Sequence, residues 1–166
     1  GIFPSSGLFN AEGYGGWKRD TVREIDIVTG CFLLMKRNLW EELGGFDRRF
    51  FMYGEDADLC LRAKKRGGQP MITPDATIVH YGGQSEKVVA DKMIRLLTAK
   101  VTLMQQHWNP VAKIFGYILF YCLPLSKIVT HWLYSTLLRK KDRKTNADTW
   151  KEIWARRSEW LAGFSA

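Results

Sequence analysis

The chain has 166 residues, of which 46% are hydrophobic and 25% are charged, and its formal net charge is +8. This composition excludes an intrinsically disordered chain, and the length suits one domain with a sizeable core or part of a larger domain. The positive charge lies mostly after residue 100, beside the most apolar stretch, which favours an anionic membrane surface over nucleic acid as a partner.

The chain carries three widely separated cysteines, Cys31, Cys60 and Cys122, each in an apolar stretch. The odd count and the lack of a CxxC pair predict buried free thiols in a reducing compartment. The first 20 residues are rich in Gly, Ser and Pro, show no periodicity and do not begin with Met. We therefore expect a loop that starts in the middle of a domain, and hence a fragment.

The next stretch predicts a strand followed by a short helix. Residues 25–37 form a brief apolar run typical of a buried strand, in which Gly30 marks a bulge or the close approach of another group. A helix is expected over residues 39–43, with Asn38 as its N-cap and Gly44 just past its end.

A longer helix is predicted from about Asp56 to Arg66, with one apolar face and basic residues in its last turn, where the helix dipole favours cations. Two short strands are expected after it, over residues 71–73 and 77–81, and the second carries His80.

Helical periodicity returns over residues 86–107, and Asn109-Pro110 begins a further helix. The longest uncharged apolar run in it has 13 residues, fewer than the roughly 18 to 20 of a membrane-spanning helix, and Pro124 interrupts it. We therefore predict that residues 109–141 form a helix in the membrane interface, with a basic cluster for lipid head groups. Packing of residues 111–138 on protein is the alternative.

The last part of the chain is predicted to contain a linker and one more helix. Residues 139–148 have the composition of a linker, whereas residues 150–161 predict an amphipathic helix. On that helix Trp150, Ile153, Trp154 and Trp160 can share one apolar side.

Residues 53–59, "YGEDADL", place Glu55, Asp56 and Asp58 within four positions. They could form a reactive site, a metal site or only the first turn of a helix, whose free N–H groups stabilise ionised carboxylates. The surrounding aromatic and glycine residues, and Asp47 in the same loop, favour a cleft lined by carboxylates. His80 precedes a Gly-Gly turn at an expected strand end, where sites in open α/β sheets are built.

A lone histidine is more often a core residue than a metal ligand, and a single histidine cannot hold a metal. If His80 is a ligand, its partners must come from outside this chain or from substrate oxygens. The sequence contains no GxGxxG, P-loop or HExxH motif.

Five motifs in order resemble the C-terminal half of family 2 glycosyltransferases: G-x-x-L-L, "GGFD-x-x-F", "YGED-x-DL-x-x-R", a proline, and "H-x-GG-x-S". The resemblance covers residues 25–85 and extends loosely to the C-terminal helices. Within the family, the chain is similar to rhamnosyltransferase-like enzymes of bacterial cell-surface polysaccharide synthesis. The galactosyltransferase families that carry a "GED" loop have tryptophan-rich loops where this chain has "FFMYGED".

The resemblance implies an α/β fold, the C-terminal part of a GT-A nucleotide-diphosphosugar transferase domain followed by amphipathic α-helices. Residues 1–107 would be the acceptor-side part of the catalytic domain. Residues 108–166 would be a helical extension at the membrane interface.

The resemblance also implies roles for single residues in an inverting transfer to an acceptor hydroxyl. Asp56 matches the general base, and Glu55 a neighbour that orients the acceptor or tunes that base. Gly30 and Asp47 match positions on the acceptor side, and His80 matches a ligand of the divalent metal.

The family's N-terminal half, with its Asp-x-Asp metal motif and nucleotide pocket, has no counterpart in the sequence. We therefore expect that the fragment is inactive alone and that Mg²⁺ or Mn²⁺ binding needs that half. The expected partners are a nucleotide-diphosphosugar, a glycan or lipid-linked glycan acceptor, and the cytoplasmic face of the plasma membrane, without nucleic acid. The alternative is a noncatalytic membrane-surface interaction module.

Overall fold

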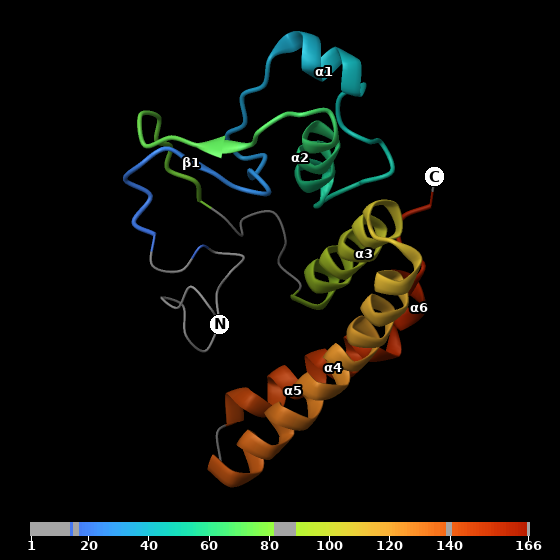
Figure 1. Ribbon diagram of the computed structural model, residues 1–166. Helices are drawn as coiled ribbons and strands as arrows, with labels where there is room; N and C mark the ends of the chain where they lie inside the picture. The colour runs from blue at the N-terminus through green and yellow to red at the C-terminus, as the bar shows by residue number, and fades with distance from the viewer. Residues whose placement is uncertain (1–13, 15–16, 82–88, 139–140, 166) are drawn as a thin grey trace.

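The structure is a computed structural model that describes residues 14, 17–81, 89–138 and 141–165. Helices predominate in this part of the chain (Figure 1). They are α1 (Arg37–Leu43), α2 (Glu55–Lys65), α3 (Val89–His107), α4 (Pro110–Leu138), α5 (Lys141–Ala155) and α6 (Arg157–Leu161). The predicted loop over residues 1–20 falls mostly outside the described residues, as do residues 82–88.

The sheet within the described residues has two short antiparallel strands, β1 (Arg23–Glu24) and β2 (Met71–Ile72). The strand expected at residues 71–73 is thus confirmed. The strands expected at residues 25–37 and 77–81 are wrong, because both segments are irregular. A strand needs hydrogen-bonding neighbours, and β2 pairs only with β1. The expected α/β architecture is therefore present only in part.

Helix α1 begins two residues before its expected start. Lys36 takes the N-cap position with an extended backbone and no side-chain cap, so the prediction of Asn38 as N-cap is wrong. Gly44 ends the helix as expected. Its φ of 73° is left-handed, a conformation that glycine adopts without strain, and its N–H donates to the carbonyl of Glu41 over 3.1 Å.

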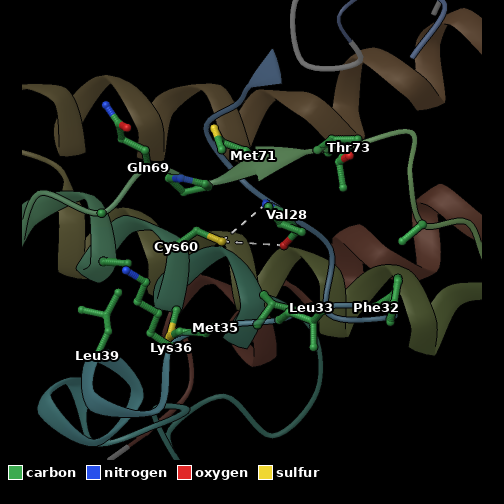
Figure 2. Close-up of a pocket in the computed structure, with 16 residues that line it drawn as sticks. Val28, Phe32, Leu33, Met35, Lys36, Leu39, Cys60, Gln69, Met71 and Thr73 are labelled. Carbon is green, nitrogen blue, oxygen red and sulfur yellow. Dashed lines mark hydrogen bonds between the residues drawn. The ribbon is translucent and has the colours of Figure 1, made fainter. Parts of the chain in front are cut away.

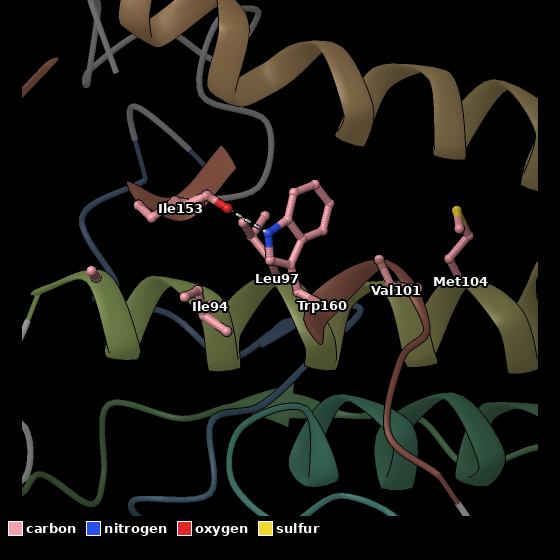
Figure 3. Close-up of a cluster of buried hydrophobic side chains, with 7 residues drawn as sticks. Ile94, Leu97, Val101, Met104, Ile153 and Trp160 are labelled. Atoms are coloured by element: carbon pink, nitrogen blue, oxygen red, sulfur yellow. Dashed lines mark hydrogen bonds between the residues drawn. The ribbon is translucent and has the colours of Figure 1, made fainter. Parts of the chain in front are cut away.

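The hydrophobic core lies between α3 and the C-terminal helices α5 and α6 (Figure 3). One face of α3 presents Leu97 and Val101 to Trp160 of α6, whose side chain is fully buried. The indole N–H of Trp160 donates to the carbonyl of Ile153 over 3.0 Å, which satisfies the one polar atom of the ring. The single helix expected over residues 150–161 is wrong, because α5 ends at Ala155 and α6 begins at Arg157, but Ile153 and Trp160 both lie in this core.

Helix α4 runs for 29 residues and continues through Pro124, so the helix expected in this stretch is present. Pro124 is buried, and α5 packs along α4 as an antiparallel partner (Figure 1). This packing holds together a helix that a proline would weaken in isolation. The linker expected over residues 139–148 is also wrong, because α5 begins at Lys141.

By length and composition alone, α4 could cross a membrane: an 18-residue window within residues 110–137 has a mean hydropathy of 1.4, and 11% of that window is buried. The sequence alone predicts a helix in the membrane interface instead, because its longest uncharged apolar run has 13 residues, fewer than the roughly 18 to 20 of a spanning helix.

All three cysteines are free, as predicted, but only Cys60 is buried. Cys31 and Cys122 are exposed, so their predicted burial is wrong. Cys31 lies in the irregular segment that replaces the expected buried strand, and Cys122 lies on a face of α4 that no described helix covers.

Candidate functional site

The N-terminus of α2 is the centre of the candidate site, and the turn before it is sharply bent. Tyr53 and Gly54 both have positive φ values, 69° and 88°. A Cβ atom at Gly54 would lie 3.1 Å from the ring of Phe50 and 3.2 Å from the Cβ of Ala99, so only glycine fits between this loop and α3. This turn places Glu55, Asp56 and Asp58 in the first helical turn.

Asp56 is half-buried and is held by two backbone donors. The N–H of Gly30 donates to Oδ2 over 2.8 Å, and the N–H of Ala57 donates to Oδ1 over 2.8 Å. Each carboxylate oxygen can accept more than one hydrogen bond, so both oxygens keep capacity for a ligand. The arrangement thus fixes the orientation of a carboxylate that is still partly open to solvent.

Gly30 is the close neighbour that the sequence indicated. A Cβ atom added to it would lie 3.4 Å from the Cβ of Asp56 and 3.7 Å from Oδ2. The lack of a side chain at Gly30 therefore keeps the space beside the carboxylate open.

Glu55 precedes Asp56 at the start of α2, and its side chain is half-buried. Its Oε2 atom is buried and has no hydrogen-bond partner among the described residues. An acceptor atom left in this state is costly unless a ligand or water fills it, which marks Glu55 as a residue that can receive a hydroxyl.

Asp58 has a different environment, because it is fully buried. Its Oδ2 atom accepts from Nε of Arg62 over 2.7 Å, and its Oδ1 atom pairs with Nε2 of His107 over 2.8 Å. Asp58 is thus a structural residue that joins α2 to the end of α3.

Arg62 extends this buried network to the end of α1. Its two terminal nitrogens donate to the carbonyls of Leu43 and Gly45, each over 2.8 Å. On the other side, Nδ1 of His107 lies 3.1 Å from Nζ of Lys65. The network from Asp58 therefore connects α1, α2 and α3, and it holds in place the helix that carries Asp56.

Asp47 is engaged with its own loop and makes no direct contact with Asp56 in the described structure. Its carboxylate accepts from Nε of Arg49 over 3.1 and 3.0 Å and from the Arg49 backbone N–H over 2.9 Å. These hydrogen bonds lower the pKa of Asp47 below its ordinary value. The expectation that Asp47 lines the same cleft as Asp56 therefore stays a prediction.

His80 lies in the irregular segment after β2 and is exposed. The Gly-Gly turn that follows it lies outside the described residues. No group of three His, Cys, Asp or Glu side chains that could hold a metal occurs in the part of the chain that the structure describes. His80 therefore offers one ligand at most, and the described residues do not form a metal site by themselves.

A pocket of about 630 Å³ opens between residues 28–36 on one side and α2 and β2 on the other (Figure 2). Its walls are mainly apolar, and Cys60 is one of the residues that line it. The N–H of Val28 donates to this sulfur over 3.4 Å, and burial raises the pKa of the Cys60 thiol. The thiol therefore acts as a small apolar group and not as a nucleophile.

Sequence reasoning missed the two partners of Asp58. The spacing of Asp58 and Arg62 by four residues was a visible signal, because side chains at i and i+4 meet on one helix face. His107 lies 49 residues from Asp58, and no local pattern connects the two.

Comparison with known proteins gives the family context of this geometry. Residues 18–99, which include α1, α2 and the Gly30–Asp56 contact, match the model described as "Glycosyltransferase like family 2". No solved structure matches the chain significantly.

Among curated proteins, the chain is 38% identical to the N-acetylglucosaminyl-diphospho-decaprenol L-rhamnosyltransferase of Mycobacterium tuberculosis, over 38% of the chain and 20% of that protein. It is 29% identical to the rhamnosyltransferase WbbL of Escherichia coli, over 58% of the chain and 39% of that protein. It is also 29% identical to the O-antigen biosynthesis protein RfbC of Myxococcus xanthus, over 52% of the chain and 6% of that protein.

The matched segments thus amount to well under two thirds of the length of each of these relatives. The matching region nevertheless contains the "GED" turn, Gly30 and the start of α3. Residues 18–99, just under half of the chain, thus match the glycosyltransferase-like family 2.

Proposed function

We propose that the chain supplies the acceptor side of an inverting glycosyltransferase, which moves a sugar from a nucleotide-diphosphosugar to an acceptor hydroxyl. The observation that carries this proposal is the half-buried carboxylate of Asp56, which two backbone N–H groups orient at the N-terminus of α2. The match of residues 18–99 to the glycosyltransferase-like family 2 supports it.

In the proposed reaction Asp56 is the general base. A sugar hydroxyl is a weak nucleophile, so a positioned carboxylate has to take its proton while the new bond forms. The acceptor oxygen attacks the anomeric carbon, the bond from that carbon to the diphosphate breaks, and the nucleoside diphosphate leaves with the bonding electrons. Because attack and departure occur on opposite faces, the anomeric configuration inverts.

Glu55 and Gly30 would serve the acceptor. The unpartnered Oε2 of Glu55 can accept a hydrogen bond from a second acceptor hydroxyl and so orient the sugar. Gly30 leaves room beside Asp56 for that sugar. We also propose that Asp47 lies on the acceptor side. Because its carboxylate is paired with Arg49, it would act on the acceptor through its charge and not through a direct hydrogen bond.

The names of the relatives suggest the two substrates. One relative is a rhamnosyltransferase that acts on N-acetylglucosaminyl-diphospho-decaprenol, and another takes part in O-antigen biosynthesis. We therefore propose an activated rhamnose as donor and a lipid-linked, diphosphate-bound glycan as acceptor, in the synthesis of a bacterial cell-surface polysaccharide.

A divalent cation, Mg²⁺ or Mn²⁺, remains a proposal for the complete catalytic centre. Such an ion would neutralise the charge of the leaving diphosphate. His80 can supply one ligand from this chain, and the others would have to come from diphosphate oxygens and from an Asp-x-Asp motif outside this sequence.

For location we propose the cytoplasmic face of the plasma membrane, where the protein would be peripheral. A lipid-linked acceptor requires a membrane, and the apolar, basic C-terminal third of the chain suits one.

The proposal is tested with the complete product of the gene that encodes this chain. We would incubate it with lipid-linked N-acetylglucosamine and a panel of radiolabelled nucleotide-diphosphosugars, and measure label in the lipid fraction. We expect transfer from one activated sugar, with inverted configuration of the product. A protein that binds the lipid vesicles but transfers none of the sugars would instead be a noncatalytic membrane-surface module.

A further inference from the structure

The face of α4 that points away from α5 is apolar and uncovered along its whole length. We define this outer stripe by Val111, Phe115, Ile118, Leu125, Val129 and Leu133. Their side chains are between 38% and 64% exposed, and they recur every three, four or seven residues. On a helix of about 3.6 residues per turn such positions lie on one side. Within the described residues, no other helix covers them.

The charged residues of α4 lie on its other side. Between Pro110 and Leu138 the sequence has two cationic lysines and no acidic residue. Lys127 lies nine residues beyond Ile118, which is about two and a half turns and therefore the opposite face. Lys113 lies five residues before Ile118, about 1.4 turns away. The outer stripe itself thus contains no formal charge.

Helix α5 limits how α4 can meet a membrane. The two helices pack side by side, and the rings of Tyr121 on α4 and Trp154 on α5 meet edge to face with centroids 4.5 Å apart. The sequence of α5 is strongly charged, with Lys141, Asp142, Arg143, Lys144, Asp148, Lys151 and Glu152. If α4 crossed a bilayer, α5 would carry these charges into the hydrocarbon, where each charged side chain near the centre is strongly unfavourable.

We propose that the α4–α5 hairpin lies flat on an anionic bilayer, with the outer stripe in the boundary between head groups and acyl chains and α5 on the water side. The choice of a membrane as partner rests on the proposed function, whose acceptor is a lipid. The net charge supports it independently: residues 101–166 contain 10 basic and 4 acidic residues, and an anionic surface attracts this excess over about a Debye length although it lies off the outer stripe. The exposed ring of Trp132 beside the stripe is of the kind that settles at lipid–water boundaries.

A second copy of the chain is the competing partner for the outer stripe. Two copies that met through α4 would bring together two segments of net charge +6 each, taken over residues 101–166. This like-charge contact disfavours a dimer but favours an anionic surface.

The natural cysteines provide a test that needs no substitution. Cys122 is exposed and lies four residues after Ile118 and three before Leu125, so it belongs to the stripe face. Cys31 is exposed in another part of the molecule and serves as the internal reference. We would measure the rate at which a water-soluble maleimide labels each thiol, with and without vesicles of phosphatidylglycerol or of phosphatidylcholine.

With phosphatidylglycerol vesicles we expect labelling of Cys122 to slow about tenfold or more, since the reagent stays in water, while Cys31 keeps its rate. Phosphatidylcholine vesicles should protect Cys122 less, and salt should reduce the protection. Unchanged labelling of Cys122 on anionic vesicles would overturn the inference. Protection that appears without vesicles as the protein concentration rises would overturn it too, in favour of a second copy.

Depth measurements separate a flat helix from a spanning one. Single cysteines would replace the stripe residues Val111, Leu125 and Leu133 in a Cys31→Ser/Cys122→Ser chain, and a fluorophore on each would be quenched by lipids brominated at different depths. A flat helix places all three labels at one shallow depth in one leaflet. A graded series with Leu125→Cys deepest would mean that α4 spans the bilayer, and would contradict the proposal.

A matched pair of charge variants completes the test. Ile118→Glu puts a carboxylate in the stripe, whereas Val79→Glu puts one at an exposed apolar position outside the hairpin. We expect at least tenfold weaker vesicle binding for Ile118→Glu only, with unchanged circular dichroism in both. Sugar transfer to a detergent-solubilised acceptor needs no vesicle. That assay therefore tests the proposed function separately from membrane binding by the hairpin.

Discussion

The backbone N–H of Gly30 lies 2.8 Å from Oδ2 of Asp56, although the two residues are 26 positions apart in the chain. This contact connects the irregular segment after β1 with the first turn of α2. The contact orients the carboxylate that we propose as general base. Because Gly30 has no side chain, it leaves space beside that carboxylate.

We therefore predict graded effects of side-chain size at residue 30. A Cβ atom there stays in ordinary van der Waals contact with Asp56, so Gly30→Ala should keep the fold and most of the transfer activity. Gly30→Val adds two methyl groups next to the carboxylate and should lower kcat about tenfold or more through misplacement of the base. Both would be compared by steady-state transfer kinetics and thermal unfolding of the complete protein. Equal kinetics for the two variants would show that this space is not used.

The buried network around Asp58 predicts a large effect on stability. Asp58→Asn removes the negative charge that faces Arg62 and His107, and it leaves a guanidinium that is only 23% exposed without its carboxylate. Breaking one side of such a pair costs about 3 to 5 kcal/mol. Urea unfolding should show this loss in the free energy of unfolding.

Asp47→Asn is the matched control for Asp58→Asn, because its partner Arg49 is 44% exposed. An exposed pair of this kind contributes about 1 kcal/mol or less. If the two variants lose the same stability, the Asp58 network does not hold the helices as described.

The hydrogen bonds from Arg49 also predict the titration of Asp47. They lower the pKa of Asp47 in the folded protein, so their stabilising effect is present above the unfolded pKa of about 3.9. It is lost as the pH falls through the lower folded value. A carboxyl NMR titration should give a midpoint below about 3.9. In Arg49→Gln the midpoint should rise, and a midpoint that does not move would exclude Arg49 as the cause.

The three thiols should differ in reactivity. Burial raises the pKa of Cys60, so this thiol stays protonated and shielded in the pocket wall. At pH 8 and without lipid, iodoacetamide should modify Cys31 and Cys122 first, with Cys60 reacting only after denaturant is added. Mass spectrometry of digested samples resolves the three sites. Early modification of Cys60 in the native protein would mean that the pocket opens readily.

The sequence predicted those features that depend on neighbouring residues. Helix α2 begins at Glu55 because a Gly turn precedes three carboxylates, and α1 ends at Gly44 because glycine adopts the left-handed conformation. The contact between Asp56 and Gly30 was indicated only indirectly: a glycine inside an apolar run marks a bulge or the close approach of another group. These are local signals, and periodicity and capping rules read them directly.

Features that depend on tertiary contacts were missed. Residues 139–148 have the composition of a linker, yet α5 begins at Lys141 and packs along α4. The apolar run at residues 25–37 has the composition of a strand, yet a strand forms only with a hydrogen-bonding neighbour. His107 lies far from Asp58 in sequence, so only folding could reveal that the two meet.

The most direct test of Asp56 as general base is sugar transfer by Asp56→Asn in the complete gene product. Asparagine keeps the shape of the side chain and can still accept from the N–H of Gly30, but it cannot take a proton. We expect kcat to fall about 10²- to 10⁴-fold, with donor affinity unchanged by calorimetry and the native fold kept, although the N–H of Ala57 loses its acceptor. Full turnover by Asp56→Asn would contradict the assignment.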